Sequence, residues 1–387
     1  MQVVTYSYSM LERVVLGEPA TTAILAEIER LGRRRVFVVT SRSVAAAAPF
    51  AAIVAALGEH CVGAFTEVSA HGPRECVIEA AAAAREARPD LLLAIGGGSA
   101  IDATKLVLLC LRHDITKTDE LDAYRGFSTS QPSVRPADEA SWLRMVAVPT
   151  TLSAAEFTWF GGAYDAVRRV KDPYGFPLMA PQAIILDPAL TLATPLPLFL
   201  STGMKAVDHA AERLASLTIE TLTEALSMQA LRLLSNGLPR VKADPTDLPA
   251  RLDCQKGMAI AMAGPNAGVG VGASHAIGHV LGGHSGVAHG HTSCILLPPV
   301  MRWNQAANGE RQKLLSEALG RPGLDAATAL AELVEGLNLP QRLRDVGVRK
   351  DDFPAIAGKV LNDYAIRANP RPVTSPEEVV EILELAW

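Results

Sequence analysis

The stretch that decides the fold is LLLAIGGGSAIDATK, residues 91–105. It begins with an apolar run at 91–95, continues through Gly96, Gly97 and Gly98, and ends in a segment rich in alanine. A short, uninterrupted apolar run is typical of a strand that is buried on both faces of a parallel sheet. Alanine favours helix, and glycine allows a tight turn between the two elements. The stretch therefore predicts one strand–turn–helix unit of an α/β sheet.

The rest of the first half repeats this alternation. Runs of β-branched and apolar residues predict strands, and alanine-rich stretches predict helices. The expected strands are residues 35–40, 91–95, 145–148 and 183–186, and the expected helices are residues 43–57, 75–87 and 100–111. Residues 116–140 carry Ser, Thr, Pro and Gln without periodicity, so we expect a surface excursion there.

The second half has a different character. After Asp187 and Pro188, β-branched runs become scarce and helical periodicity dominates, with proline-bearing breaks near residues 239–249 and 370–372. The chain has 387 residues, more than one hydrophobic core usually serves. We therefore predict two domains with a boundary near 187–197. Residues 1–190 form a dinucleotide-binding α/β domain with a Rossmann-like parallel sheet, and residues 191–387 form an all-α domain that carries the histidine site.

The composition is that of a globular protein. Hydrophobic residues make up 49% and charged residues 20% of the chain, and the formal net charge is -5. No basic tract is present, so we expect no nucleic-acid partner. No apolar run approaches the roughly 20 residues of a membrane span, and the first residues lack a signal pattern. The five cysteines form no Cys-x-x-Cys pair. We expect a soluble, cytoplasmic protein that binds a small molecule.

The glycine turn is a candidate phosphate site. Glycines let backbone amides approach a pyrophosphate, and the following helix adds its positive end, while Ser99 offers a hydroxyl to phosphate or caps the helix. A tight turn without a ligand is the alternative interpretation. Thr150, Thr151 and Ser153 follow the next strand, at the edge of the sheet where ligands of doubly wound folds bind. Together the two segments favour a dinucleotide.

The residues after the first predicted strand bear on which dinucleotide is bound. Thr40, Ser41 and Arg42 stand where an acidic residue would hold the adenosine 2′-hydroxyl. Because a carboxylate is missing and an arginine is near, NADPH is expected to be accepted as well as NADH.

Five of the nine histidines lie between residues 275 and 291. His275 and His279 are four residues apart and share a helical face, and glycines 282 and 283 are expected to turn the chain so that His289 returns beside them. Lys205 precedes His209 by the same spacing on another predicted helix. Imidazoles that converge from two helices normally suggest a divalent metal. The other histidines are expected to be structural or solvated, with His71 left open: His60, His113, His284 and His291.

These motifs resemble the iron-dependent (group III) alcohol dehydrogenase superfamily. Its pattern is Gly-Gly-Gly-Ser…Asp…Lys, Pro-Thr-Thr, Gly-Met-Asp-x-x-x-His-Ala, His-x-x-x-His and a further His-Gly, and it matches nearly the whole chain. The resemblance implies the dehydroquinate synthase-like fold, NADH or NADPH as cofactor, and a homodimer. Combined with the motifs above, it gives these cofactor contacts: Thr40, Ser41, Gly96, Gly97, Gly98, Ser99, Asp102, Thr150, Thr151, Ser153 and Leu186.

One position departs from the pattern. Metal-dependent members carry an aspartate ligand where this chain has Lys205, and a protonated ammonium repels a divalent cation. Asp208 is expected to face away from the row that holds His209. We therefore expect iron or zinc to bind weakly or not at all; if a metal is bound, the resemblance makes His209, His275 and His289 its ligands, with His279 near the reacting carbon.

Residues 149–158 and 369–373 are similar to the maleylacetate reductase branch, which is metal-independent and usually has asparagine at the position of Lys205. This resemblance implies an NAD(P)H-dependent oxidoreductase of aromatic-compound catabolism that reduces an enone or carbonyl of a small, carboxylate-bearing substrate. Lys205 would then hold the oxyanion, and His279 or His275 would relay a proton. The expected catalytic set is Lys205, His209, His275, His279 and His289, and the candidates for binding the carboxylate are Arg168, Arg169 and Lys171.

Three other functions stay open at this point. The first is an alcohol or aldehyde dehydrogenase in which three histidines suffice to hold iron or zinc. The second is a non-redox lyase or cyclase that keeps the fold and the nucleotide, as in the related dehydroquinate synthases. The third is an inactive binding protein.

Overall fold

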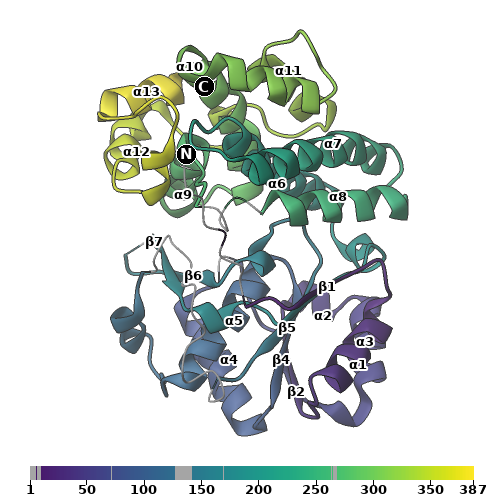
Figure 1. Cartoon of the computed structure of the whole chain (residues 1–387). Coiled ribbons are helices and arrows are strands. Elements are labelled where there is room, and N and C mark those ends of the chain that lie inside the picture. Colours follow the sequence, from purple (N-terminus) through teal and green to yellow (C-terminus); the bar gives the residue numbers. More distant parts are fainter. Residues whose placement is uncertain are drawn as a thin grey trace. The chain divides into compact units, whose positions relative to one another are not determined.

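The computed structural model describes residues 6, 10–70, 72–126, 142–168, 170–262, 264 and 268–387. The chain divides into two compact units, one spanning Ser7–Thr194 and the other formed mainly by Pro195–Trp387. The first is an α/β unit and the second is helical, which confirms the predicted fold class (Figure 1).

A parallel sheet forms the centre of the α/β unit. The strands lie in the order β1, β8, β5, β4, β2, β3, and every pairing between them is parallel. Their bounds are β1 (Arg13–Leu16), β2 (Val36–Thr40), β3 (Cys61–Phe65), β4 (Leu91–Gly96), β5 (Met145–Pro149) and β8 (Ala183–Leu186). The predicted strands are confirmed as β2, β4, β5 and β8. The short edge strand β1 and the half-buried β3 were not predicted.

Helices cover both faces of this sheet (Figure 1). They are α1 (Ala20–Arg30), α2 (Arg42–Ala45), α3 (Ala48–Leu57), α4 (Arg74–Ala87) and α5 (Gly98–Arg112). Leu91, Leu93 and Ile95 of β4 share one core with α1 and α3, while α5 contacts β4 as well. Every residue of β4 is buried, which explains its uninterrupted apolar run. Burial of that apolar surface, at about 25 cal/mol per Å², drives this packing.

One expectation for the helices was wrong and another is confirmed. Residues 43–57 form two helices, because Pro49 occupies the first turn of α3, where a residue without an N–H is tolerated. The break expected near residues 239–249 lies between α7 (Thr221–Ala243) and α8 (Leu248–Ala261), whereas Pro239 itself lies inside α7. Proline removes one backbone hydrogen bond from the helix, and the burial of apolar residues along α7 offsets this loss. The buried residues include Leu231, Leu234, Leu238 and Val241. Within the predicted excursion, Asp119–Tyr124 form a 3-10 helix, and residues 127–140 lie outside the described residues.

A buried lysine ties α5 to the segment that follows β5. The Nζ of Lys105 donates to the carbonyl oxygens of Ala155 (2.6 Å) and Phe160 (2.9 Å) and to Thr158 Oγ1 (2.8 Å). Burial lowers the pKa of Lys105 to about 8. The segment after β5 carries the predicted nucleotide residues 150–153, so Lys105 helps to position them.

The helical unit is built around α6 (Leu196–Leu214), which packs against α7, α8 and α10. The other helices are α8 (Leu248–Ala261), α9 (Ala273–Ser285), α10 (His289–Ala318), α11 (Ala326–Gly336), α12 (Phe353–Val360) and α13 (Pro376–Leu385). The chain turns between α9 and α10 at Gly286, which has a left-handed conformation (φ 68°), and not at glycines 282 and 283, which continue α9. Among the described residues, no helix has the length and apolarity to cross a membrane.

We expect Lys105→Met to lower the free energy of unfolding by about 1–3 kcal/mol, because buried carbonyl groups lose a charged donor. The pKa of Lys105 is lower in the folded chain than in the unfolded chain, so the unfolded chain binds more protons between about pH 8 and pH 10.5. The stability of the wild type relative to the variant should therefore rise through that range. Urea unfolding at several pH values measures both effects, with exposed Lys313→Met as the control. A variant as stable as the wild type would contradict this role.

Candidate active site

Helix α6 carries polar side chains that are unusual in a buried helix. Lys205 and His209 are one turn apart, and so are Asp208 and Glu212. Because residues four apart lie on the same helical face, the chain forms two neighbouring rows, one with a cation and an imidazole and the other with two carboxylates. His209, Asp208 and Glu212 are buried. Burial and nearby positive groups hold the pKa of His209 well below its ordinary value.

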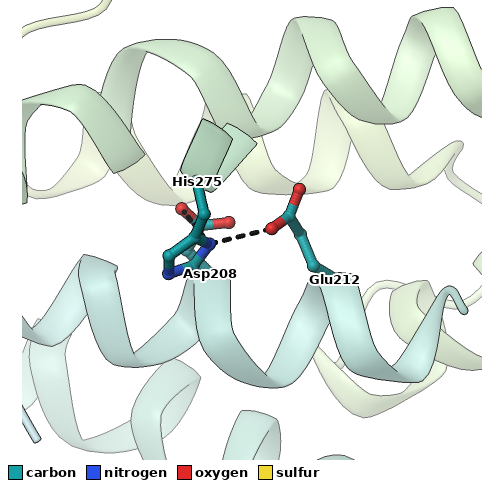
Figure 2. A group of neighbouring side chains, drawn as sticks. All are labelled: Asp208, Glu212 and His275. Atoms are coloured by element: carbon teal, nitrogen blue, oxygen red, sulfur yellow. Dashed lines mark hydrogen bonds and ion pairs between the residues drawn. The ribbon is translucent and has the colours of Figure 1, made fainter. Parts of the chain in front are cut away.

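Glu212 binds the start of α9. One carboxylate oxygen accepts from the backbone N–H of Ser274 and the other from that of Gly272, both at 2.8 Å. The second oxygen also lies 2.8 Å from Nδ1 of His275 (Figure 2). A carboxylate only accepts hydrogen bonds, so Nδ1 carries the hydrogen and Nε2 keeps its lone pair. Glu212 therefore fixes both the place and the tautomer of His275, and burial lowers the pKa of this imidazole to about 3.

Asp208 also contacts this imidazole, which corrects the expectation that it faces away. Its Oδ2 accepts from Ser274 Oγ (2.9 Å) and lies 3.6 Å from His275 Nδ1 (Figure 2). Burial raises the pKa of Asp208 and of Glu212 to about 7. The ligand atoms of Asp208, Glu212 and His275 lie within 4.8 Å of one another, close enough for a metal. An ion there would displace the N–H groups that hold α9, so the set is better explained as a hydrogen-bond network behind His275.

The structure brings the four predicted site histidines together. The rings of His209 and His275 stack with centroids 4.7 Å apart, the His275 and His279 centroids are 6.2 Å apart, and those of His279 and His289 are 5.5 Å apart. Nδ1 of His279 lies 2.9 Å from Oδ2 of Asp363, a partner that the sequence did not indicate. His289 opens α10, whose start lies tightly against α6.

Gly290 makes the close approach of α10 to α6 possible. A Cβ at Gly290 would lie 2.7 Å from the backbone carbon of Ser201, so a larger residue would push the two helices apart. The position of His289 therefore depends on its neighbour in sequence.

The residues of this site carry features both for and against a divalent metal. His209 Nδ1 and His275 Nε2 are buried without a hydrogen-bond partner, as ligand atoms would be. However, the positive charge of Lys205 acts on both rings, where it contributes after burial to their lowered pKa values. A positive charge that acts on both rings opposes the binding of a divalent cation at their nitrogens.

The glycine turn of the α/β unit fits a dinucleotide. Gly96 has a φ of 144°, and a Cβ at Gly97 or Gly98 would lie 3.1 Å from the Thr151 side chain or 3.0 Å from the Ser153 hydroxyl. The hydroxyls of Thr151 and Ser153 are buried without a hydrogen-bond partner. A pyrophosphate would supply acceptors for them, and α5 begins at Gly98 without a side-chain cap.

Other predicted cofactor residues have partners within the chain. Thr40 Oγ1 donates to the carbonyl oxygen of Ile95 (2.6 Å), and Asp102 pairs with Lys171 (2.8 Å). Leu186 is buried at the end of β8. Ser99 lies inside the first turn of α5 and is not its cap, because Gly97 occupies that position. The Ser41 hydroxyl accepts a hydrogen bond from the backbone N–H of Val44. The backbone N–H of Thr150 donates to the carbonyl oxygen of Gly96, and the Thr150 carbonyl oxygen accepts from the Thr194 hydroxyl.

The cations predicted to bind a substrate carboxylate are already paired. Arg168 contacts Asp165 and Asp172, and Lys171 contacts Asp102. They belong to the antiparallel hairpin of β6 (Phe160–Asp165) and β7 (Val170–Gly175), which was not predicted. Arg169 and His71 lie outside the described residues.

Arg42 and three of the remaining histidines have partners within the chain. Arg42, proposed to accept a 2′-phosphate, forms an ion pair with Glu67. Three of the histidines expected to be structural have contacts within their own unit: His60 with the Arg34 carbonyl, His113 with the Tyr124 ring and His284 with Lys359.

Glu212→Gln should lower the free energy of unfolding by about 1–3 kcal/mol, because one amide oxygen cannot replace two carboxylate oxygens toward three donors. Nitrogen NMR of labelled histidine should show His275 losing its fixed Nδ1–H tautomer. The matched control is Glu224→Gln, which removes a partly exposed pair with Arg311 and should cost under about 1 kcal/mol. Equal losses in the two variants would show that Glu212 does not have this role.

Known protein families match both units. A family model described as iron-containing alcohol dehydrogenase matches residues 12–188, and one described as Fe-containing alcohol dehydrogenase family, C-terminal, matches residues 199–387.

Individual relatives cover nearly the whole chain. A maleylacetate reductase of Sphingobium indicum is 32% identical over 375 residues, which are 97% of this chain and 95% of the relative. A 4-hydroxybutyrate dehydrogenase of Cupriavidus necator is 30% identical over 378 residues, 95% and 96% of the two chains. The crystal structure of maleylacetate reductase from Agrobacterium tumefaciens matches with a TM-score of 0.82 and 25% identity, over 100% of this chain and 99% of that one. The chain belongs to the iron-containing alcohol dehydrogenase family of oxidoreductases.

Proposed function

We propose that this protein is an NAD(P)H-dependent reductase of the maleylacetate reductase type, which reduces an enone or carbonyl of a small, carboxylate-bearing substrate without a metal ion. The observation that carries the proposal is Lys205, one turn before the buried His209, at the position of the aspartate ligand in metal-dependent members. Two relatives named as maleylacetate reductases, one known by sequence and one by structure, support this direction.

The residues of the helical unit can manage the charge that this reaction creates. A nicotinamide, when bound, would supply a hydride to the substrate carbon, and the substrate oxygen would then carry the negative charge of an enolate or alkoxide. The ammonium of Lys205 stabilises that oxyanion electrostatically, in a site whose imidazoles are neutral. A fixed charge in a site of low dielectric needs little reorganisation as the negative charge develops.

His279 is the residue best placed to deliver the proton. It is partly exposed, unlike His209 and His275, so it can exchange protons with solvent. Asp363 accepts from its Nδ1 and orients the ring, so Nε2 is the atom that gives a proton to the oxyanion or carbanion. The products are the reduced substrate and the oxidised nicotinamide.

A metal-dependent alcohol dehydrogenase is the second candidate. It is favoured by one observation, the buried and unpartnered Nε2 of His275, held in a ligand-like tautomer by Glu212. In that case Lys205 would have to leave the row or lose its proton.

Substitution of Lys205 separates the two candidates. Lys205→Met should lower kcat by about 100- to 1000-fold, as loss of one oxyanion donor does, while Lys205→Arg keeps part of the rate. Lys205→Asp should gain close to one equivalent of iron or zinc per chain, measured by inductively coupled plasma mass spectrometry on protein purified without nickel resin. Wild-type protein with stoichiometric metal, inactivated by a chelator, would overturn the metal-free mechanism.

Nucleotide binding is tested at the glycine turn. Gly97→Val places a side chain against Thr151 and should weaken NADH and NADPH binding at least about tenfold, measured by quenching of protein fluorescence. Gly336→Ala, where a Cβ meets nothing within 4 Å, is the control and should bind as the wild type does. Unchanged affinity in Gly97→Val would place the nucleotide elsewhere.

A further inference from the structure

Segments from three neighbouring strands meet at the carboxyl end of β2. Thr40, the last residue of β2, pairs with Ile95 of β4, and its carbonyl oxygen accepts from the backbone N–H of Val68 (3.2 Å), after β3. A Cβ at Gly96 would lie 3.8 Å from Val44 Cγ2 and 3.9 Å from Thr40 Oγ1. Helix α2 therefore lies against the glycine turn, and the residues after β3 lie one strand further out.

An ion pair joins α2 to the segment after β3. The first residue of α2, Arg42, donates from Nε to Oε2 of Glu67 (2.7 Å), and its Nη2 contacts the same oxygen. The other carboxylate oxygen accepts from the Thr66 hydroxyl (3.2 Å). The hydrogen bond from Arg42 holds the pKa of Glu67 below its ordinary value, so the carboxylate is ionised at neutral pH.

The stability of the fold does not explain this pair. The side chain of Arg42 is 84% exposed and that of Glu67 is 44% exposed, and ion pairs with such exposure contribute little to stability. Between Arg35 and Arg74 the sequence has no lysine or arginine other than Arg42. Arg42 is therefore the one cation that this stretch of the α/β unit can offer to an anionic ligand, and Glu67 occupies it.

The pair lies where a doubly wound fold distinguishes two nucleotides. In such folds the pyrophosphate binds at a glycine turn, and residues after the adjacent strand contact the adenosine ribose. A carboxylate there accepts from a 2′-hydroxyl, and an arginine accommodates a 2′-phosphate. Here β4 leads into the glycine turn, and β2 is a neighbouring strand. Residues 40–42 include no acidic side chain, but Glu67 brings a carboxylate to this place from the end of β3.

We infer that Glu67 makes the site prefer NADH to NADPH, because its carboxylate occupies the arginine that would otherwise bind a 2′-phosphate. This inference rests on the proposed function and assigns its cofactor preference to one residue. A 2′-phosphate would have to separate Arg42 from Glu67 and would then lie near a like charge, and both effects disfavour NADPH. The 2′-hydroxyl of NADH is uncharged and leaves the pair intact.

Dissociation constants for NADH and NADPH, measured by isothermal titration calorimetry at neutral pH, test the inference without turnover. The wild type should bind NADH at least about tenfold more tightly, as the strength of a charged hydrogen bond predicts. Glu67→Gln should tighten NADPH binding about tenfold and leave NADH binding within about twofold, because it frees Arg42 and removes the repelling charge. Glu59→Gln removes an exposed carboxylate just before β3, at the other end of that strand, and should change neither constant.

A second variant shows whether the arginine carries the gain. Glu67→Gln combined with Arg42→Gln should lose the added affinity for NADPH, and both side chains are exposed enough for the variant to fold. A gain that persists in the double variant would overturn the inference, since the carboxylate would then act without Arg42. Equal affinities in the wild type, or an unchanged ratio in Glu67→Gln, would also overturn it and leave the proposed function standing. A wild type that binds neither nucleotide would overturn both.

Discussion

The carboxylate of Glu212, bound to the start of α9, is the interaction on which the histidine site depends. The N-terminus of a helix presents free N–H groups and the positive end of the helix dipole, so a buried carboxylate is most stable there. Glu212 uses this site to join α6 to α9, and the same oxygen orients His275. Since His279 follows one turn later on α9, its position depends on the same bond. The arrangement of the α6 and α9 histidines thus depends on one carboxylate.

Helical periodicity explains how α6 keeps opposite charges apart although they alternate along the chain. Asp208 and Glu212 share the row that faces α9, and their oxygens bind Ser274, Gly272 and His275. Lys205 and Arg213 share the row of His209, and their positive charges would stabilise a negative group there. The polarity of the site therefore comes from the register of one helix.

Sequence patterns predicted those features that depend on neighbours in the chain. The run at residues 91–105 correctly predicted β4, the turn and α5. The four-residue spacing of His275 and His279 correctly predicted that they share one face of a helix, which is α9. Contacts between distant residues could not be predicted in this way. Asp363 pairs with His279 although 84 residues separate them in the sequence. Lys171 pairs with Asp102, 69 residues away, so the sequence wrongly suggested that Lys171 is available to bind a substrate. The hairpin β6–β7 was missed because its Gly161, Gly162 and Pro173 are poor strand formers.

The exchange of a metal ligand for a lysine has a consequence for the direction of the reaction. A divalent ion lowers the pKa of a bound hydroxyl by many units and so prepares an alcohol for oxidation. An ammonium is a weaker aid to deprotonation, since it stabilises negative charge only as a hydrogen-bonding point charge. It suffices where hydride addition itself creates the anion, and it suits an enolate best, because an enolate is far less basic than an alkoxide. A site with Lys205 in place of the metal should therefore favour reduction of conjugated or activated carbonyl groups over oxidation of simple alcohols.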